Sequence, residues 1–476
     1  KIIAAAAGVD YVKPGDIHTV TLDRMMSNDG TTHLTVDMYR NKLKHPHIAD
    51  TKKMVFIVDH NVPSDCPKTA ASQKKMRDFA KENNIDFWEG KGVCHQVMME
   101  HYVCPGELIF GADSHTCSYG ALGAFGTGVG CTDLLYGMVT GKSWVLVPET
   151  VKFNLVGKLP EGVYARDLIL TIIGTIGANG CNYQVMEFTG EGAKTLSISE
   201  RMVLCNMAVE AGAKTGIFEP DEKAIEYLKA HGRKPKALFT SDPDAVYARE
   251  YTFDLSKIRP VVAKPDFVDN LVPAEEVRGV KIDEAFLGSC NNGRIEDLRV
   301  GASILKGRHV AEKVRFLVVP ASQTVYLQAL KEGLIDTDTI IIDAKSGTSG
   351  AGRSAKVPSL YCEVNESMKP YGVASHRHTP EIEEQLSYAA GKPVMISFTP
   401  HLVPMNRGIL ATAYAKLAKK VTAEEVKAVY DKYYKEEYFV RVMDIGMVPQ
   451  TRWVEGSNFA DIAFQIDPRT DRIVMM

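Results

Sequence analysis

At 476 residues and 52.4 kDa the chain is too long for one ordinary hydrophobic core, and about two to four domains are expected. The 56 Lys and Arg residues nearly balance the 59 Asp and Glu residues, so the net charge of −3 gives no reason to expect nucleic acid or an acidic membrane as a partner. With 45% hydrophobic and 24% charged residues, the composition excludes disordered, collagen-like and coiled-coil chains. A small molecule is therefore the expected ligand.

The cysteines and the first residues bear on where the protein works. Nine cysteines, an odd number without the spacing of a disulfide framework, argue against a secreted scaffold and favour the reducing cytoplasm. No apolar run approaches the roughly 18 residues of a membrane span, and residues 1–16 hold too few apolar side chains for a signal peptide. Because the chain opens on Lys1, we expect it to be part of a longer translation product.

The first two thirds alternate short apolar runs with amphipathic stretches, which is typical of α/β proteins. An amphipathic stretch covers 69–83, and further helices are predicted over 165–174, 199–211 and 322–332. Strands are predicted over 54–58, 107–110, 143–147, 150–156, 285–287 and 315–319. This alternation favours parallel sheets covered by helices.

The last third has a different character. From about residue 354, isolated histidines, prolines and aromatic residues become more frequent, and strands are predicted over 393–398 and 438–442. This pattern is typical of an α+β domain, and we place the boundary near 333–340. The sequence therefore predicts a first part over 1–333 and a second over 334–476.

The first part holds one dense set of chemically active side chains. They are Asp59, His60, His95, Asp113, Ser114, His115, Asn206, Glu210, Cys290 and Arg294. Most follow a predicted strand, and the carboxyl ends of strands in an α/β sheet converge on one crevice. Asn206 and Glu210, four residues apart, are expected on one face of a helix, where an amide and a carboxylate suit ligand orientation and proton transfer.

Each of these side chains also has a structural interpretation. The Asp113 segment can cap a helix, Glu210 can lie on a solvated face, and Cys290 can be a buried small hydrophobe. The surroundings of Cys290 decide against the last reading. Gly288 and Ser289 precede it and Asn-Asn-Gly-Arg follows, so it lies in a polar turn where an exposed thiolate can bind iron.

Five ordered motifs in residues 1 to about 333 resemble the aconitase superfamily, in the branch of the 3-isopropylmalate dehydratase and homoaconitase large subunits. They are FIVDH at 56–60, FGADSHT at 110–116, GTGVG at 126–130 with TGK at 140–142, LCNM at 204–207 with Glu210, and GSC at 288–290 with GRIED at 293–297. The resemblance implies three-layer α/β domains with mostly parallel sheets. It also implies reversible dehydration of a hydroxy di- or tricarboxylate on a [4Fe–4S] cluster, as in leucine biosynthesis.

The resemblance assigns roles to the site residues. It gives the catalytic acid and base network to Asp59, His60, His95, Asp113, His115 and Glu210, and substrate binding to Ser114, Asn206 and Arg294. Arg294 can equally anchor the turn of the cysteine motif. Cys290 matches the first of three cluster ligands. Large subunits of this branch work with a separate small subunit, so a partner chain is implied.

The expected Cys-x-x-Cys about sixty residues after Cys290 is absent. The only later cysteine is Cys362, and a cubane held at three irons needs three thiolates. From about residue 334 the chain instead resembles the C-terminal half of N-acetyl-γ-glutamyl-phosphate reductase, an enzyme of arginine biosynthesis. The matching segments are DAKSGTSGAGR at 343–353, CEVNE at 362–366, SHRHTPE at 375–381, FTPHLVPMNRG at 398–408 and GSNF at 456–459.

This second resemblance implies a catalytic and dimer-forming α+β domain. His376 or His378 falls where a general acid/base histidine lies, and Arg377 and Arg407 resemble carboxylate or phosphate anchors. The nucleotide domain of that family and its nucleophilic cysteine have no counterpart here, so reductase chemistry lacks both its NADPH site and its nucleophile.

Three functional hypotheses follow. The first is a hydro-lyase acting on a hydroxy acid such as isopropylmalate, impaired because two cluster cysteines are absent. The second is a remnant of an NADPH-dependent reductase, and the third is a catalytically inactive chimera or scaffold. Both resemblances contain a passage like KEGLI at 331–335, where the parts join through a natural fusion, an engineered joining or an error in assembling the sequence. The interrupted domain favours the last two origins.

Overall fold

The computed structural model describes residues 1–43, 47–311, 313–335, 340–352, 357, 360–373, 375–390, 394–417 and 419–476. The chain divides into two compact units, Lys1–Ile335 and Asp336–Met476. Part of the predicted boundary region, 336–339, lies outside the described residues, as do Arg353 of the second resemblance and Pro393 of a predicted strand.

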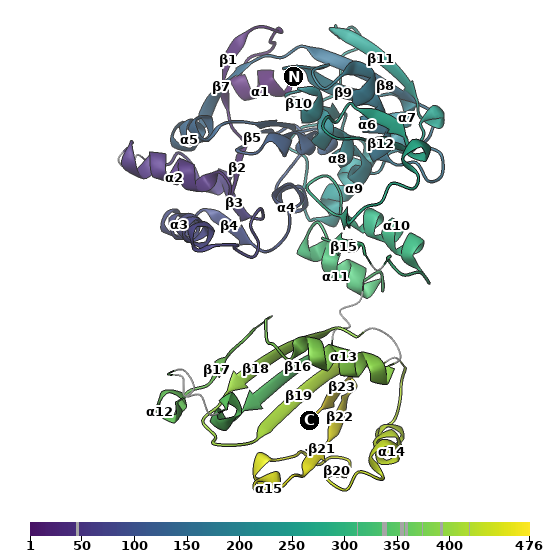
Figure 1. Cartoon of the computed structure of the whole chain (residues 1–476). Coiled ribbons are helices and arrows are strands. Elements are labelled where there is room, and N and C mark those ends of the chain that lie inside the picture. Colours follow the sequence, from purple (N-terminus) through teal and green to yellow (C-terminus); the bar gives the residue numbers. More distant parts are fainter. Residues whose placement is uncertain are drawn as a thin grey trace. The chain divides into compact units, whose positions relative to one another are not determined.

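The first unit is built on a five-stranded parallel sheet in the order β4-β3-β2-β5-β6 (Figure 1). Its strands are β2 (Arg24–Asn28), β3 (Met54–Val58), β4 (Asp86–Glu89), β5 (Leu108–Gly111) and β6 (Phe125–Gly128). Chain order runs from β2 outward through β3 and β4, then returns to the other side of β2 with β5. The carboxyl end of β2 is thus a topological switch point, where crevices form in α/β sheets.

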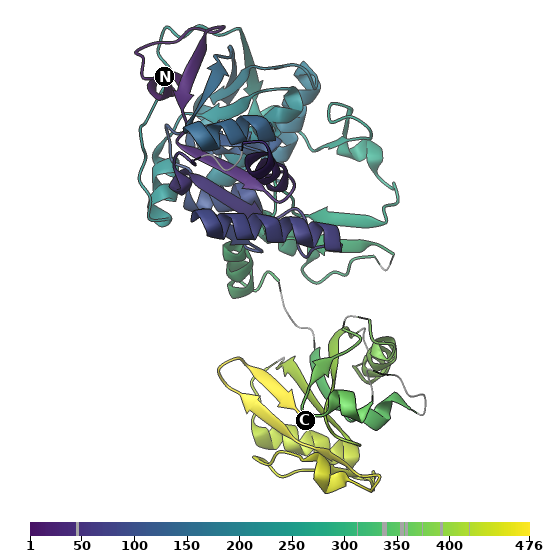
Figure 2. The same ribbon diagram turned by 90° about the vertical axis from the view of Figure 1, so that its left-hand side faces the viewer.

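Helices cover both faces of this sheet. One layer holds α2 (Thr32–Asn41), α3 (Pro67–Asn83) and α5 (Cys131–Thr140), and Figure 2 turns it toward the viewer. The other layer contains α4 (Cys94–His101) and the 3-10 helix η2 (Ser114–Leu122). All of β3 is buried: Phe56 belongs to the core beside α3, whereas Val55 and Ile57 belong to the core beside α4. The predicted continuous apolar strand is confirmed because both of its faces are covered.

A second parallel sheet has the order β10-β9-β8-β11. Its strands are β8 (Thr150–Val156), β9 (Val185–Thr189), β10 (Thr215–Phe218) and β11 (Arg249–Asp254), and its helices are α6 (Ala165–Ile176), α7 (Glu191–Thr195), α8 (Ile198–Asn206), η3 (Met207–Ala211) and α9 (Glu222–Ala230). Gly120 of η2 lies directly against β10, since a Cβ built on it would stand 1.7 Å from the Gly216 carbonyl oxygen. The two layers meet through glycine because no side chain fits there.

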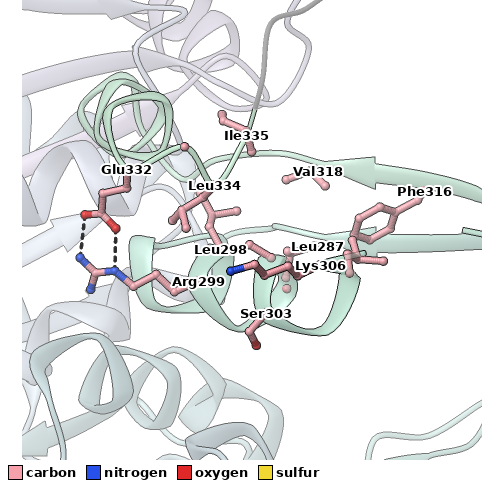
Figure 3. A pocket seen from close by; sticks show the side chains of 14 residues that line it. Leu287, Leu298, Arg299, Ser303, Lys306, Phe316, Val318, Glu332, Leu334 and Ile335 are labelled. Atoms are coloured by element: carbon pink, nitrogen blue, oxygen red, sulfur yellow. Dashed lines mark hydrogen bonds and ion pairs between the residues drawn. The ribbon is translucent and has the colours of Figure 1, made fainter. Parts of the chain in front are cut away.

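Residues 280–335 form a small lobe at the end of the first unit. Parallel strands β14 (Glu284–Leu287) and β15 (Arg315–Val318) carry α10 (Ile295–Leu305) and α11 (Gln323–Lys331). A cavity of about 570 Å³ opens between them (Figure 3), with an Arg299–Glu332 ion pair of 2.7 Å at its edge. Its apolar lining includes Leu287, Leu298, Phe316, Val318, Leu334 and Ile335.

Hydrogen bonds connect this lobe to α4 and to the segment just before it. The Val93 amide donates to Ala321 O at 2.9 Å, and the Gln323 amide donates to Lys91 O at 2.8 Å. The buried Ser322 hydroxyl donates to Glu100 Oε1, also at 2.8 Å. The turn at Cys290 in this lobe lies against α8, whose Asn206 Nδ2 is 3.5 Å from Cys290 O.

The second unit is the expected α+β domain. Its six-stranded mixed sheet has the order β17-β18-β16-β19-β23-β22. The strands are β16 (Ile340–Ser346), β17 (Lys369–Pro370), β18 (Ile396–Leu402), β19 (Ile409–Lys416), β22 (Phe464–Asp467) and β23 (Arg472–Met475), and the longer helices are α13 (Thr379–Ala390) and α14 (Ala423–Tyr434). Strands β20 (Val440–Val442) and β21 (Ala460–Ile462) pair separately.

The remaining elements of the chain are short. They are α1 (Ile2–Ala7), β1 (Ile17–Thr21), η1 (Thr51–Lys53), β7 (Lys142–Leu146), η4 (Leu255–Lys257), β12 (Val261–Ala263), β13 (Leu271–Pro273), η5 (Ala274–Val277), η6 (Thr348–Ala351), α12 (Tyr361–Val364) and α15 (Thr451–Val454). In the described part of the chain, no helix has the length and apolar character needed to cross a membrane.

Candidate active site

A buried carboxylate organises the turn after β3. Asp29 follows β2 and is 5% exposed. Its Oδ1 accepts the backbone N–H groups of Asp59 at 3.0 Å and His60 at 2.9 Å. Its Oδ2 accepts the Asn61 amide at 3.1 Å. Burial alone would raise the pKa of this carboxyl, but the hydrogen bonds from His60, Asp59 and Asn61 outweigh it and the pKa is lowered.

This turn presents Asp59 and His60. His60 Nδ1 lies 2.8 Å from Asp59 Oδ1, and Asp59 Oδ2 accepts the Cys94 amide at the start of α4 at 2.6 Å. The hydrogen bond to Asp59 raises the pKa of His60 to about 9, against a smaller opposing effect of burial. His60 is therefore protonated at neutral pH although half of its side chain is exposed.

Asp113, two residues after the end of β5, has the side chains of three histidines within 4 Å of its carboxylate. Its Oδ1 lies 2.8 Å from Nε2 of the buried His95 and 3.7 Å from Nδ1 of His115. Its Oδ2 accepts Asn28 Nδ2 at 3.0 Å and lies 3.6 Å from His60 Nε2. Burial works against ionisation, but the hydrogen bonds with His115 and His95 prevail, and the pKa of Asp113 falls well below its usual range.

His115 joins Asp113 to Glu210. Its Nε2 lies 3.6 Å from Glu210 Oε1, and the two carboxylates together raise the pKa of His115 to about 10. The same contact with His115 lowers the pKa of Glu210. Asp113 also caps η2 by accepting the His115 amide at 2.8 Å, so the structural interpretation of this segment holds alongside its place in the site.

The segment predicted as a helix over 199–211 is helical throughout, but it changes from α-helix to 3-10 helix, so the expectation that Asn206 and Glu210 share one helical face is wrong. The α-helix ends at Asn206, and Glu210 lies in η3, which closes on the left-handed Gly212. With about three residues per turn in a 3-10 helix, side chains four apart no longer align. Asn206 therefore points to the cysteine turn while Glu210 faces His115.

The turn at Cys290 lies beside these groups. Asn206 Nδ2 lies 3.5 Å from Cys290 O, and Asn206 Oδ1 accepts Asn291 Nδ2 at 3.0 Å. Arg166, at the start of α6, donates to Asn291 Oδ1 at 2.6 Å. Ser289 takes a left-handed backbone with φ of 85°, a strained conformation that holds the partly exposed Cys290 at the end of β14.

Arg294 has the contacts of an anchor. It is 3% exposed, and its guanidinium donates to the backbone carbonyls of Asn291 at 2.5 Å and Ser199 at 3.2 Å. These bonds match the alternative in which Arg294 fixes the cysteine turn. Its binding of a substrate carboxylate stays a prediction.

A cavity of about 550 Å³ opens at the switch point. Its lining comes from the ends of β2, β5 and β6 and includes Asn28, His60, Asp113, Ser114, Thr127 and Lys214. Of the residues predicted from sequence, His60, Asp113 and Ser114 line this cavity. Close polar contacts connect Asp59, His95, His115 and Glu210 to them, and Asn206 lies beside the Cys290 turn.

The candidates in the second unit are dispersed. His376 packs against the rings of His378 and Phe398 at 5.1 and 5.2 Å, and burial lowers its pKa. Arg377 is exposed. Arg407 is also exposed and lines a cavity of about 880 Å³ beside α15. Among the described residues of this unit, no hydrogen bond or ion pair joins the three histidine-segment residues to Arg407, and their roles stay predictions.

The fold and the site define an α/β protein whose switch point carries an acid–base network of three histidines and four carboxylates. Residues 1–278 and 267–340 match the model of the aconitase family (aconitate hydratase), and residues 319–476 match the semialdehyde dehydrogenase dimerisation domain. The chain belongs to the aconitase family, and its C-terminal domain is of the semialdehyde dehydrogenase dimerisation type.

Three relatives show how far the similarity extends. A protein of Methanothermobacter thermautotrophicus described as a probable 3-isopropylmalate dehydratase large subunit is 46% identical over 397 residues, 82% of this chain and 94% of the relative. The 3-isopropylmalate dehydratase large subunit of Hydrogenobaculum sp. is 48% identical over 352 residues, 73% of this chain and 82% of its own. A probable methanogen homoaconitase large subunit of M. thermautotrophicus is 46% identical over 344 residues, 71% of this chain and 80% of its own.

The donor set does not fit the cluster that the family resemblance implies. Holding a [4Fe–4S] cubane through three irons requires three thiolates. Beside the site, Cys290 is partly exposed, but Cys94 and Cys117 are buried. Burial raises the pKa of the Cys94 thiol strongly and that of Cys117 to about 12, and Cys117 Sγ lies 3.3 Å from Asn206 O. Among the described residues, the partly exposed thiols near this site are Cys290 and Cys131, which contacts Thr31 O at 3.6 Å, so the three thiolates of a cluster are not assembled.

Sequence reasoning missed Asp29, Arg166 and Lys214. Asp29 directly follows β2, whose sequence Arg-Met-Met-Ser-Asn is too polar to be recognised as a strand from its pattern. Arg166 lies in the first turn of α6, where a cation opposes the helix dipole, and this unusual placement could have drawn attention to it.

Proposed function

We propose that residues 1–333 form the large-subunit body of a hydro-lyase of the 3-isopropylmalate dehydratase or homoaconitase type. In this proposal the cavity at the switch point binds a hydroxy di- or tricarboxylate such as isopropylmalate. The observation that carries it is the convergence of His60, His95 and His115 on Asp113. The similarity to large subunits over more than two thirds of the chain supports the same substrate class.

The histidines supply the proton chemistry. His60 and His115, whose pKa values are raised to about 9 and about 10, hold a proton at neutral pH and can donate it to a departing hydroxyl. Asp59 and Glu210 face these two imidazoles and stabilise their protonated forms. Asp113 fixes the orientation of His95 and His115, as second carboxylates do in acid–base pairs.

We further propose that turnover is impaired in this chain, because Cys290 is left without the two partner thiolates of the cluster. Residues 1–333 then retain substrate binding and the surface for a small subunit that completes the pocket, with a role in leucine biosynthesis in the cytoplasm. Residues 334–476 add a domain incomplete as an N-acetyl-γ-glutamyl-phosphate reductase.

Iron analysis with ligand binding tests this proposal. After anaerobic purification and reconstitution, we expect well under four irons and four sulfides per chain, and calorimetry should detect 2-isopropylmalate binding. Dehydratase activity with an added small subunit should remain below that of an intact large subunit by at least 10³-fold, the order of loss when a principal catalytic group is removed. A full cluster with normal activity contradicts the impairment, and absence of isopropylmalate binding contradicts the function.

A second candidate function rests on the C-terminal domain. Its match to a dimerisation domain favours a scaffold that joins two copies of the chain, whereas a reductase remnant would bind NADPH. Fluorescence titration with NADPH separates the two, since binding supports the remnant. A dimer by light scattering, together with capture of the small subunit by an iron-free chain, supports the scaffold.

A further inference from the structure

The GTGVG motif and the segment after η3 bring two unused polar groups to the switch-point cavity. Thr127, in β6, and Lys214, between η3 and β10, both line the cavity that contains His60, Asp113 and Ser114. Both also line the neighbouring cavity of about 270 Å³. Neither takes part in the network around Asp113.

Lys214 carries a charge without an ion-pair partner. Its Nζ donates a long hydrogen bond of 3.5 Å to Gly128 O and lies 5.2 Å from the centroid of the Tyr183 ring. Within the described residues no carboxylate forms an ion pair with it. Burial lowers the pKa of this partly buried ammonium, and Asp133 opposes that effect only at a distance. A partly desolvated charge of this kind is stabilised when a counter-ion neutralises it.

Thr127 gives an independent sign of a ligand. It is 3% exposed, and its Oγ1 has no hydrogen-bond partner. Buried hydroxyls in folded proteins nearly always have one, so an unpaired hydroxyl beside a cavity indicates a group that enters from the cavity. The two residues thus offer an ammonium and a hydroxyl, the donors that a carboxylate accepts.

We propose that Lys214 and Thr127 form a subsite for one carboxylate of the substrate, next to the acid–base network. This inference rests on the proposed function and specifies which side of the cavity holds the remote carboxylate. Lys214 neutralises that group while His60 and Ser114, on the strand ends beside it, remain available to the reacting hydroxyl. The subsite therefore selects dicarboxylates over monocarboxylates.

A binding comparison on the full chain tests the subsite. The probes are 2-isopropylmalate and 2-hydroxyisovalerate, a monocarboxylate that lacks its second carboxyl arm, both measured by calorimetry at fixed salt. For Lys214→Met we expect a ten- to hundredfold weaker dicarboxylate affinity, and for monocarboxylate affinity a change below threefold. Thr127→Val, which removes only the hydroxyl, should weaken the dicarboxylate about fivefold to tenfold.

Two control variants separate the effect of Lys214 from that of removing any lysine. Lys158→Met removes an exposed lysine that lines neither of the two cavities, and it should leave both affinities unchanged. Lys214→Arg keeps the positive charge and should keep most of the dicarboxylate preference. Equal dicarboxylate affinity in Lys214→Met and the parent chain, both folded by circular dichroism, overturns the subsite alone. If the parent chain binds neither probe, the proposed function and the subsite fall together.

Discussion

Replacing Asp29 tests whether its carboxylate holds the turn after β3 in place. Its Oδ2 accepts the Asn61 amide at 3.1 Å, Asn61 Nδ2 at 3.3 Å and Gln73 Nε2 at 3.4 Å. In Asp29→Asn the new NH₂ faces those donors while the remaining oxygen keeps the bonds to Asp59 and His60. A hydrogen bond to a charged group contributes about 1.5–3 kcal/mol, and donors left buried without partners add a similar cost. We expect a loss of about 3 kcal/mol.

The assay is urea unfolding followed by tryptophan fluorescence. Trp453 lies in the second unit, so a Trp453→Phe background leaves Trp88 and Trp144 to report on the first unit alone. Asp37→Asn is the matched control, because Asp37 pairs with Lys75 at the surface and such ion pairs contribute less than about 1 kcal/mol.

The pH dependence gives the refuting result. The pKa of Asp29 is lower in the folded chain than the roughly 3.9 of an unfolded aspartate, so the unfolded state binds more protons as pH falls. The stabilisation is fully present above about pH 4 and is lost as pH falls through the folded pKa. The gap between parent and Asp29→Asn should be constant from pH 7 to 5 and shrink below 4. A gap under about 0.5 kcal/mol at pH 7, or one that grows on acidification, refutes the reasoning.

Two further predictions concern His60 and the packing of the layers. By NMR the His60 imidazole should titrate near pH 9, and Asp59→Asn should move this midpoint toward 6.5. The small, solvent-screened contribution of the His60–Asp59 pair to folding stability is present below about pH 6.5 and is lost as pH rises toward 9. A midpoint near 6.5 in the parent chain would contradict this prediction. Gly120→Ala should cost at least about 3 kcal/mol and most of the soluble yield, because its Cβ would meet the Gly216 carbonyl, whereas Gly130→Ala, whose nearest contact is 3.4 Å, should melt within about 2 °C of the parent.

Much of the site could be predicted from the sequence because its residues follow strands with a recognisable apolar pattern. The buried run at 54–58 and the strand before Asp113 are both apolar, and parallel pairing on either side of β2 brings Asp59, His60 and Asp113 together. The central strand β2 was not predicted because Arg24–Asn28 is polar at its ends, and Asp29, which follows it, was therefore not identified as part of the site. The change from α-helix to 3-10 helix before Glu210 was not predicted, because hydrophobic periodicity does not distinguish an α-helix from a terminal 3-10 turn.

The lobe of residues 280–335 has a consequence for amide exchange. Its own core is small, formed by Leu298, Val325 and Ala329. Hydrogen bonds attach the lobe to the segment around α4 and, through Asn291 and Arg294, to α6 and α8. A unit with so little buried apolar surface opens at a free energy below that of global unfolding. Amides of β14 therefore exchange with solvent before those of the fully buried β3, and each opening withdraws Cys290 from His115 while the parallel sheet stays closed. The thiol and the histidines thus belong to regions of different local stability within one site.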